Sequence, residues 1–413
     1  MELKNTDIDN SDYFIKDAGI GDEILNEVKS LKMGIDDDFI YGVSDESTRS
    51  FSQRVNDFLI DHSKVTLKDK SYMFHMLAVM VDSGVPVVQA VKTLANYTDN
   101  MRFRRILHTI AHNCEGGAKL ADAMSRFEDV FTEAEMGIVR AGEETGRLDV
   151  TLFKLSSQLD QQYELNMKLW SASIYPIAVL AVLIVVTVGM LLFVLPSLLT
   201  LLTEGGMTID KLPMATRVLM SIQKAFTDYW WLMLIILGMA YGFFSVYIGT
   251  DYGAVKWDYV KLRLPIIGKL LRKIYVLRFV SMMGLLIEAG IPVIRVLKVT
   301  GNAVSNRIYK LEIQQIINKV KTGAKISESM ADAEFLFSHE VVEMIKVGES
   351  TAQLAEVTTK VANQYQREVD NTLRKVTALF EPIMILFVGL FVALLAVAIM
   401  APIFSLNSVV TLR

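Results

Sequence analysis

The sequence predicts an all-α integral membrane protein with two duplicated cytoplasmic helical-bundle domains and three transmembrane helices. Three observations predict this class. One block of sequence occurs twice, three long runs carry no charge, and no stretch alternates apolar and polar residues with the period of a strand. The composition agrees. The hydrophobic content of 52% and the mean hydropathy of +0.35 are higher than a soluble protein of 413 residues needs, and the charged content of 21% is low.

The duplication has a constant offset. Gly84-Val85-Pro86 recurs as Gly290-Ile291-Pro292, which lies 206 residues later. The same offset relates a longer series of pairs: Gly117 and Gly323, Gly142 and Gly348, Glu143 and Glu349, Leu148 and Leu354, Pro176 and Pro382, and Pro196 and Pro402. A register kept without gaps over this distance indicates a repeated module rather than shared composition.

The uncharged runs predict the membrane spans. They contain 35 residues between Lys168 and Glu204, 22 between Asp228 and Asp251, and 31 between Glu381 and Arg413. A helix needs about 20 apolar residues to cross a bilayer, so each run spans once, and we expect transmembrane helices at 170–202, 229–250 and 377–404. The first and third runs are also compatible with helices that extend into an adjoining bundle. Proline interrupts helices, so we expect Pro176 and Pro382 to start spans, and Pro196 and Pro402 to end them, at the membrane surface.

Charge near the spans predicts the topology. The first residues are acidic and lack an apolar core, so they do not resemble a signal peptide. Basic residues cluster after the second run, and such clusters stay in the cytoplasm: Lys256, Lys261, Arg263, Lys269, Arg272 and Lys273. We therefore expect the N-terminus and both repeat domains in the cytoplasm, with the loop 203–228 and the tail 405–413 outside.

Residues 1–70 form an acidic preface, with 16 Asp and Glu against 9 Lys and Arg. We expect either a solvated arm or a docking segment for a basic partner. Nucleic acid is not expected as a partner, since that would require basic residues interleaved with aromatic ones. The single cysteine, Cys114, excludes an intrachain disulfide, and core filling is its expected role.

The repeat domains are expected at 71–169 and 251–376, each a bundle of five or six short antiparallel helices. Gly84 suits a tight turn, and Pro86 suits a first helical turn, where the missing N–H is tolerated. Thr132 followed by Glu135 predicts a reciprocal N-terminal cap. The second copy has Ser338 and Val341 there, so half of the cap is kept.

The most informative motif is Ala-Gly-Glu-Glu-Thr-Gly-Arg-Leu at 141–148, matched by Val-Gly-Glu-Ser-Thr-Ala-Gln-Leu at 347–354. Its glycines either end a helix in a left-handed cap or let two helices approach closely. Glu143 and Glu349 are either structural or present paired carboxylates to a partner or a cation. On the second interpretation, Glu143→Lys or Glu349→Lys disturbs partner coupling without affecting insertion. The second copy has Ala352 at the position that corresponds to Gly146. Any role of unusual backbone angles at this position is therefore weaker in the second copy.

The order of these motifs, their duplication and the three spans resemble the type II secretion F family, which are inner-membrane platform proteins of type IV pili and type II secretion systems. The resemblance covers 71–196 and 276–402. It implies a non-enzymatic protein of the cytoplasmic membrane that forms homo-oligomers and contacts a hexameric assembly ATPase. It further implies contacts with pilins or pseudopilins, with other inner-membrane assembly proteins and with lipid. The resemblance is weakest over the first 70 residues.

Other functions are weighed against this one. No phosphate-binding loop of the Gly-x-x-x-x-Gly-Lys-Ser/Thr type occurs. His339-Glu340 lacks the second histidine of a zinc helix, and His108 and His112 have no counterparts in the second copy, so we expect no metal and no cofactor. A subunit of a multi-chain channel or export gate is the alternative, although charge-free spans do not favour it. A membrane enzyme with an unrecognised site is the third hypothesis.

Overall fold

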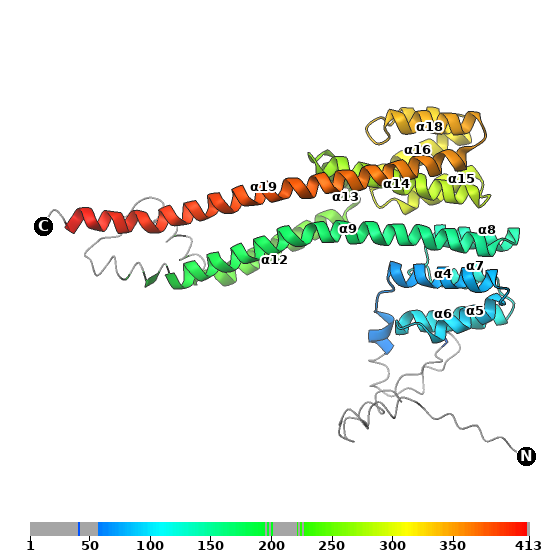
Figure 1. Ribbon diagram of the computed structural model, residues 1–413, viewed down its shortest axis with the longest axis horizontal. Coiled ribbons are helices and arrows are strands. Elements are labelled where there is room, and N and C mark those ends of the chain that lie inside the picture. The colour runs from blue at the N-terminus through cyan, green and yellow to red at the C-terminus, as the bar shows by residue number, and fades with distance from the viewer. Residues whose placement is uncertain are drawn as a thin grey trace, which may run out of the picture. The chain divides into compact units, whose positions relative to one another are not determined.

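The computed structural model describes residues 40–41, 57–194, 196–197, 200, 221, 224 and 227–410 (Figure 1). Most of the predicted acidic preface, most of the predicted loop 203–228 and the last three residues lie outside this part of the chain. The described residues form helices and turns and contain no strand, which confirms the all-α class. The chain divides into two compact units, residues 1–160 and 161–413.

The first unit holds the first repeat. It comprises α4 (Leu67–Asp82), α5 (Val87–Asn96), α6 (Met101–Glu115), α7 (Leu120–Met124), α8 (Glu133–Thr145) and the first part of α9 (Leu148–Gly189). Large aromatic side chains fill its core, where Phe74 and Phe103 each lie about 6 Å, ring to ring, from Phe131. Burying such rings supplies much of the free energy that holds a small bundle together.

The second unit continues along α9 through a short π-helical segment, η1 (Met190–Val194), and then α12 (Trp230–Gly249) and α13 (Asp251–Arg263). The second repeat follows as α14 (Ile267–Glu288), α15 (Val293–Ala303), α16 (Arg307–Lys321), α17 (Ile326–Ala331), α18 (His339–Ser350) and α19 (Leu354–Val410). Helices α15 to α19 each begin 206 residues after their counterparts α5 to α9, which confirms the duplication.

Helix caps agree with the sequence. Thr132 accepts a hydrogen bond from the Glu135 backbone N–H and Glu135 accepts one from Thr132, which is the predicted reciprocal cap of α8. Ser338 accepts from the backbone N–H of Val341 without the return bond, so half of the device is kept. Asn100 and Asn306 cap α6 and α16 in the same way, which anchors equivalent helices at the same residue of each repeat.

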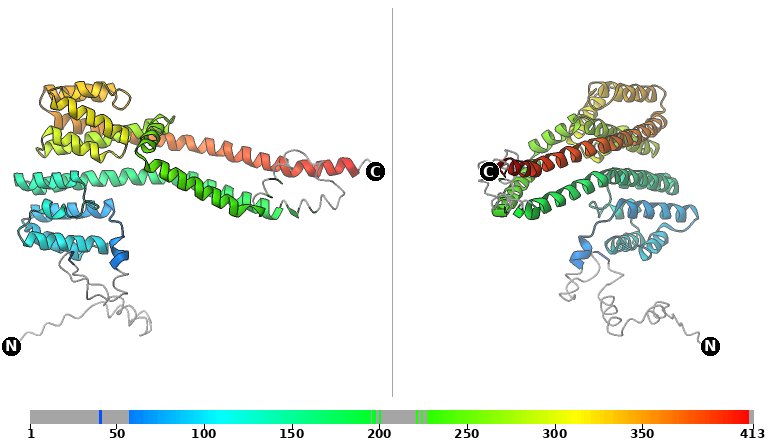
Figure 2. Two further views of the ribbon diagram at one scale, coloured as in Figure 1. Left: turned by 180° about the vertical axis from the view of Figure 1, so that it is seen from behind. Right: turned by 60° about the vertical axis from the view of Figure 1, so that its left-hand side comes forward.

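Three apolar helices are long enough to cross a membrane: Leu148–Val194, Trp231–Gly249 and Leu354–Val397. Their most apolar stretches lie almost entirely on the outside of the protein, as lipid-facing surfaces must. The first and third helices begin in the repeat domains, so the predicted span 170–202 continues α9 as far as its described residues reach without a gap, to Val194, and the predicted span 377–404 lies within α19. This agrees with the alternative that these two runs extend into an adjoining bundle. In Figures 1 and 2, α19 runs as one helix from the second repeat towards the C-terminus.

The expectation that prolines start and stop these helices was wrong for Pro176, Pro382 and Pro402, and for Pro196 it stays a prediction, because much of the chain around this residue lies outside the described residues. Pro176 lies inside α9, and Pro382 and Pro402 lie inside α19. A proline removes one backbone donor, but a helix of this length keeps many hydrogen bonds on either side of the break, and membrane helices tolerate the loss. Pro196 is itself helical and lies two residues after the end of the π-helical segment η1. The position of the four prolines at the membrane surface remains a prediction.

Candidate functional site

The motif residues gather at one end of each bundle, which we call the distal pole. In the first repeat this end holds the turns α4–α5, α6–α7 and α8–α9, where Gly84, Gly117 and Gly146 have φ of 84°, 91° and 67°. Such positive φ values favour glycine. The second repeat has the same turns with φ of 81° at Gly290 and 97° at Gly323. Because α9 and α19 begin here and lead to the spans, this pole is the end of each bundle farthest along the helix from the membrane.

Prolines follow the first of these turns in both repeats. Pro86 and Pro292 are the residues immediately before α5 and α15, one position earlier than expected from the sequence. Their carbonyls accept hydrogen bonds from Ala90 and Val296, so each proline starts its helix although it donates no bond itself.

Glu143 connects two turns of the pole. Its carboxylate accepts hydrogen bonds from the backbone N–H groups of Leu120 at 2.6 Å and Ala121 at 3.0 Å, the first two residues of α7. The residue before α7, Lys119, makes no side-chain cap, so the carboxylate on α8 replaces the missing local cap. A negative group at a helix N-terminus also complements the helix dipole.

Glu349 does the same in the second repeat. It accepts from the backbone N–H groups of Ile326 at 2.7 Å and Ser327 at 2.9 Å, and also from the Ser327 hydroxyl. Both oxygens of each carboxylate are thus engaged within their own bundle. This arrangement favours the structural interpretation of the two glutamates over carboxylates presented to a cation or a partner.

Each glycine of the motif has a distinct role. A Cβ on Gly142 would lie 3.2 Å from the Leu148 Cα and closer still to the Thr151 side chain, and one on Gly348 would lie 3.1 Å from the Leu354 Cα. These glycines let α8 pack on α9 and α18 on α19. Gly146 instead ends α8 in the left-handed conformation. Both interpretations of the motif glycines therefore hold, at different positions.

Ala352 departs from the expectation for the second copy. Its φ of 55° keeps the left-handed conformation of Gly146 although alanine disfavours it. We expect Ala352→Gly to stabilise the second repeat by about 0.5–1 kcal/mol, because the relieved strain exceeds the added freedom of the unfolded chain. Thermal unfolding of the full chain in detergent measures this, with Gly146→Ala as the reciprocal variant that should destabilise. A lower unfolding temperature for Ala352→Gly would contradict the assignment.

The distal pole of the second repeat is hollowed. A pocket of about 860 Å³ lies among the ends of α14, α16 and α18 and the starts of α15, α17 and α19. Gly348, Glu349 and Leu354 line it, together with four further charged residues: Lys325, Glu343, Lys346 and Glu356. A lining that combines apolar side chains with charges of both signs is suited to docking a protein segment.

Cys114 lies close enough to the first pole to interact with Glu143. Burial, and secondarily the Glu143 charge, raises the pKa of the thiol from 9.0 to about 11. Below that pH most of Cys114 is protonated, and only the thiolate reacts with an alkylating reagent. We therefore expect alkylation at pH 8 to be about a hundredfold slower than for a free cysteine peptide. The rate should continue to rise up to about pH 11. A rate that levels off near pH 9, as in the peptide, would show an ordinary thiol.

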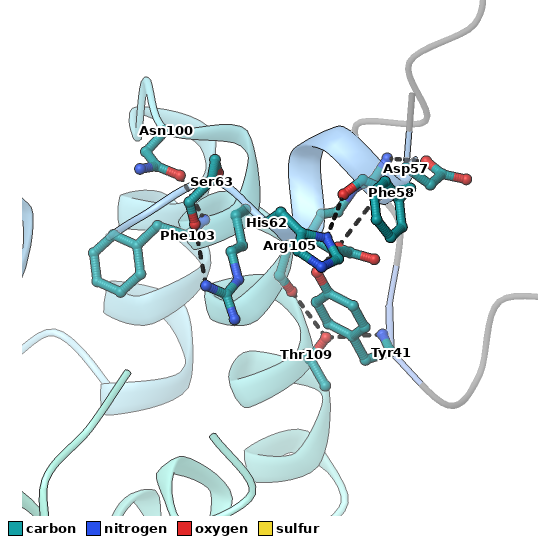
Figure 3. Close-up of polar contacts among 11 residues, drawn as sticks. Tyr41, Asp57, Phe58, His62, Ser63, Asn100, Phe103, Arg105 and Thr109 are labelled. Carbon is teal, nitrogen blue, oxygen red and sulfur yellow. Dashed lines mark hydrogen bonds and ion pairs between the residues drawn. The ribbon is translucent and has the colours of Figure 1, made fainter. Parts of the chain in front are cut away.

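The described residues before α4 belong to the first bundle rather than to a solvated arm (Figure 3). The backbone N–H of Tyr41 donates to the Thr109 hydroxyl at 3.0 Å, and the Tyr41 hydroxyl donates to Asp61. Arg105, which is 1% exposed, places its guanidinium 2.7 Å from the Asp57 carboxylate. Burial and the neighbouring Asp61 raise the pKa of Tyr41. This part of the preface thus packs on α6.

Sequence reasoning missed a buried ion pair. Lys70, assigned to the acidic preface, lies in α4, and its ammonium donates to both Glu135 oxygens at 2.8 and 2.9 Å and to the Val130 carbonyl at 2.9 Å. Both side chains are at least nine-tenths buried. The equivalent residues of the second repeat are Val276 and Val341, which are also buried. This paired exchange between the two copies was the available signal.

The other sequence candidates are not brought together. Among the described residues, no group of three or more His, Cys, Asp or Glu side chains is placed to hold a metal ion. His108 is buried in α6, and His339 begins α18.

Comparison with known proteins identifies the repeats. A profile of the family described as "Type II secretion system (T2SS), protein F" matches residues 73–196 and again 279–402, two segments with the 206-residue offset. A type IV pilus assembly protein PilC of Thermus thermophilus is 33% identical, over 82% of this chain and 83% of that protein. PilC of Myxococcus xanthus is 32% identical, over 82% and 80%. A type II secretion system protein F of Pseudomonas aeruginosa is 28% identical, over 84% of each chain.

Proposed function

The chain belongs to the type II secretion system protein F family, and we propose that it is an inner-membrane platform protein of a type IV pilus or type II secretion machine. In this role it couples a hexameric cytoplasmic ATPase to the assembly of pilins or pseudopilins. The observation that carries the proposal is the continuity of α9 and α19, each of which joins a distal pole to a candidate span without a break.

Continuous helices suit mechanical coupling. A displacement applied at a distal pole passes along a single helix to the lipid-facing end, whereas a flexible linker would absorb it. Membrane topology completes the proposal. The basic segment after α12 favours a cytoplasmic location for both repeats, so that both poles face the compartment that contains the ATPase.

The proposal assigns no catalytic step to this chain. The carboxylates of the motif cap helices, and the buried Lys70 and Glu135 pair with each other inside the bundle. Nucleotide energy therefore comes from the partner ATPase. Homo-oligomerisation and contacts with other inner-membrane assembly proteins are part of the same proposal.

The pole of the second repeat offers a direct test of the ATPase contact. Lys325→Glu combined with Lys346→Glu reverses two of the charges that line the pocket and leaves Gly348, Glu349 and Leu354 unchanged. We expect the variant to reach the membrane at normal levels, to lose co-purification of the ATPase and to assemble few surface fibres or secrete little cargo. Lys310→Glu, an exposed lysine of α16 outside the pocket, is the matched control. If the double variant assembles fibres normally and still co-purifies the ATPase, the pocket is not part of the ATPase contact.

Deletion of the whole chain tests the broader proposal. Loss of fibres or of secretion is expected, and restored assembly by the intact chain completes the comparison. Solute flux through vesicles that contain the purified chain would instead indicate the channel or export gate.

A further inference from the structure

The chain bends where the second span meets the second repeat (Figure 2). Helix α12 ends at Gly249, Thr250 follows, and α13 starts at Asp251. Residues 264–266 then join α13 to α14. We call residues 252–269 the elbow. Because only two residues separate α12 from the elbow, the elbow begins at a membrane surface.

The exposed face of α13 combines aromatic and cationic side chains. Gly253, Ala254, Asp258 and Leu262 are buried, whereas an opposite face at helical spacing is exposed: Tyr252, Lys256, Tyr259 and Arg263. The Arg263 guanidinium lies 4.6 Å from the centre of the Tyr259 ring, and the Lys256 ammonium 5.9 Å from that of Tyr252. Tyrosine and long cationic side chains have an apolar body with a polar tip, which suits the boundary between lipid and water.

The turn after α13 is strained. Ile266 has φ 68° and ψ −66°, and the Ile267 N–H donates to the Pro265 carbonyl at 2.8 Å, which defines a γ-turn with positive φ. A β-branched residue rarely adopts such angles, at a cost of about 1–3 kcal/mol. The turn leaves Leu264, Ile266 and Ile267 between 41% and 46% exposed. In water, the strain and the exposed aliphatic surface are both unfavourable, and immersion of these side chains in lipid would offset both.

The charges of the elbow are unbalanced. Residues 252–269 contain four basic residues, Lys256, Lys261, Arg263 and Lys269, and one acidic residue, Asp258. Asp258 points inwards, because its carboxylate accepts from the Arg307 backbone N–H at 2.9 Å and pairs with Lys261 at 2.6 Å. Among the described residues, the ion pairs do not include Lys256, Arg263 or Lys269, all three of which are exposed. The elbow therefore presents a net positive surface.

The packing of α14 on α19 places the C-terminal end of the elbow beside the start of the apolar part of α19. Helix α14 runs antiparallel to α19, since a Cβ on Gly284 would lie 2.8 Å from the Thr358 hydroxyl and the Lys273 ammonium is 3.3 Å from the Thr372 hydroxyl. Continuing this register along α14 by about two turns brings its first residues beside the end of the charged part of α19, near Glu381. Both ends of the elbow thus lie close to where a span begins.

The first repeat provides a natural contrast. With the 206-residue offset, Phe58 corresponds to Leu264, and Asp57 and Asp61 correspond to Arg263 and Ile267. Phe58 is 61% exposed, so this position also presents apolar surface, but Asp57 and Asp61 flank it where the elbow has Arg263 and Ile267. Among the described residues, positive charge next to a candidate span is therefore found at the elbow of the second repeat and not at the matching position of the first.

We propose that the elbow is an interfacial membrane anchor that binds anionic phospholipid, with Leu264, Ile266 and Ile267 immersed at the headgroup–acyl boundary and Lys256, Arg263 and Lys269 on headgroup phosphates. Basic clusters next to a span attract anionic lipids, and amphipathic surfaces of this kind lie in the interface plane. The anchor fixes the base of the second repeat against the bilayer, so that force applied at its distal pole is resisted at a defined point.

The test places nitroxide labels on the full chain with Cys114→Ser as background. Leu264→Cys is compared with Phe58→Cys, its matched control, and with Leu237→Cys in α12. The chain is reconstituted in phosphatidylcholine vesicles with a minor fraction of phosphatidylglycerol. We expect collisions of the label at 264 with a water-soluble nickel complex to be about tenfold fewer than at 58, since interfacial side chains lie about 5–10 Å below the surface. Collisions with oxygen at 264 should be at least as frequent as at 58 and fewer than at 237, which lies deeper in the bilayer.

Each other outcome overturns part or all of the proposal. Equal nickel access at 264 and 58 would place the elbow in water. Low access to both nickel and oxygen at 264 would show that protein, such as a second copy of this chain, covers the elbow instead of lipid. The combined variant Lys256→Gln, Arg263→Gln and Lys269→Gln should increase access of the nickel complex to the label at 264 about as much as omission of phosphatidylglycerol does. Unchanged access in both cases would overturn the role of anionic headgroups.

Discussion

Replacing Glu135 alone by leucine is expected to destabilise the first repeat by about 3–5 kcal/mol, because it leaves the Lys70 ammonium buried without its counter-charge. Replacing Lys70 by methionine at the same time should restore most of this loss. The second repeat supplies the precedent, since it folds with Val276 and Val341 at the equivalent positions and buries both. A buried ion pair and a well-packed apolar pair are often nearly equal in free energy, whereas half of an ion pair is not tolerated.

Amide hydrogen exchange on the full chain measures this effect within each repeat. Peptides from α4 and α8 should lose about two to three decades of protection in Glu135→Leu and less than one decade in the double variant. Peptides from α14 and α18 serve as the internal control and should not change. The account fails if the double variant is as unprotected as the single one, which would mean that the ion pair itself holds the bundle together.

Removing the Glu143 or Glu349 carboxylate is expected to cost about 2–4 kcal/mol in its own repeat. Glu143→Ala leaves two N–H groups at the start of α7 without their acceptor, and hydrogen bonds to a charged group contribute about 1.5–3 kcal/mol each. Because Glu143 is only half-buried, water replaces part of what the two bonds contribute. Glu349→Ala should cost at least as much, because the Ser327 hydroxyl also loses its acceptor. The neighbouring exposed residue provides a matched control, Glu144→Ala, with a change expected within about 0.5 kcal/mol.

Because both carboxylates cap helices, the charge reversals Glu143→Lys and Glu349→Lys are no longer expected to affect partner coupling alone. Glu143→Lys places a cation against the positive end of α7, so loss of partner coupling is expected together with loss of stability in that repeat. Hydrogen exchange in α7 and α17 separates the two effects. If a variant keeps full amide protection in α7 and α17 but no longer co-purifies the ATPase, the two glutamates contact the partner rather than only stabilising their repeats.

The duplication, the helical class and the three spans could be predicted because each leaves a periodic or long uninterrupted signal in one chain. Local caps were predictable for the same reason, as Thr132 and Glu135 show. The role of Glu143 was not, since the N–H donors to its carboxylate lie on a helix more than twenty residues away and nothing local marks the pairing. The carboxylate is a cap supplied from another helix, which single-sequence reasoning on local caps does not detect.

Two errors have other physical causes. The prolines were expected to bound helices, but that rule describes helices in water, and α9 and α19 keep enough hydrogen bonds to continue through them. Lys70 was counted in the preface because residues 1–70 were grouped by their excess of acidic residues, and a lysine is rarely buried. Its burial depends on a partner 65 residues away. Comparing the two repeats position by position would have shown that Lys70 and Glu135 are replaced together by valines.

The central claim is that two copies of one helical module stand on the same side of the membrane and are tethered to it by continuous helices. Cysteine accessibility in intact cells tests it most directly, with Cys114→Ser as background and single cysteines at Lys119, Lys325 and, in the predicted outer loop, Thr208. We predict that a membrane-impermeant maleimide labels position 208 in intact cells but reaches 119 and 325 only after the inner membrane is opened. Labelling of only one of positions 119 and 325 in intact cells would place the two repeats on opposite sides, labelling of both would place both repeats outside, and either result would contradict the account.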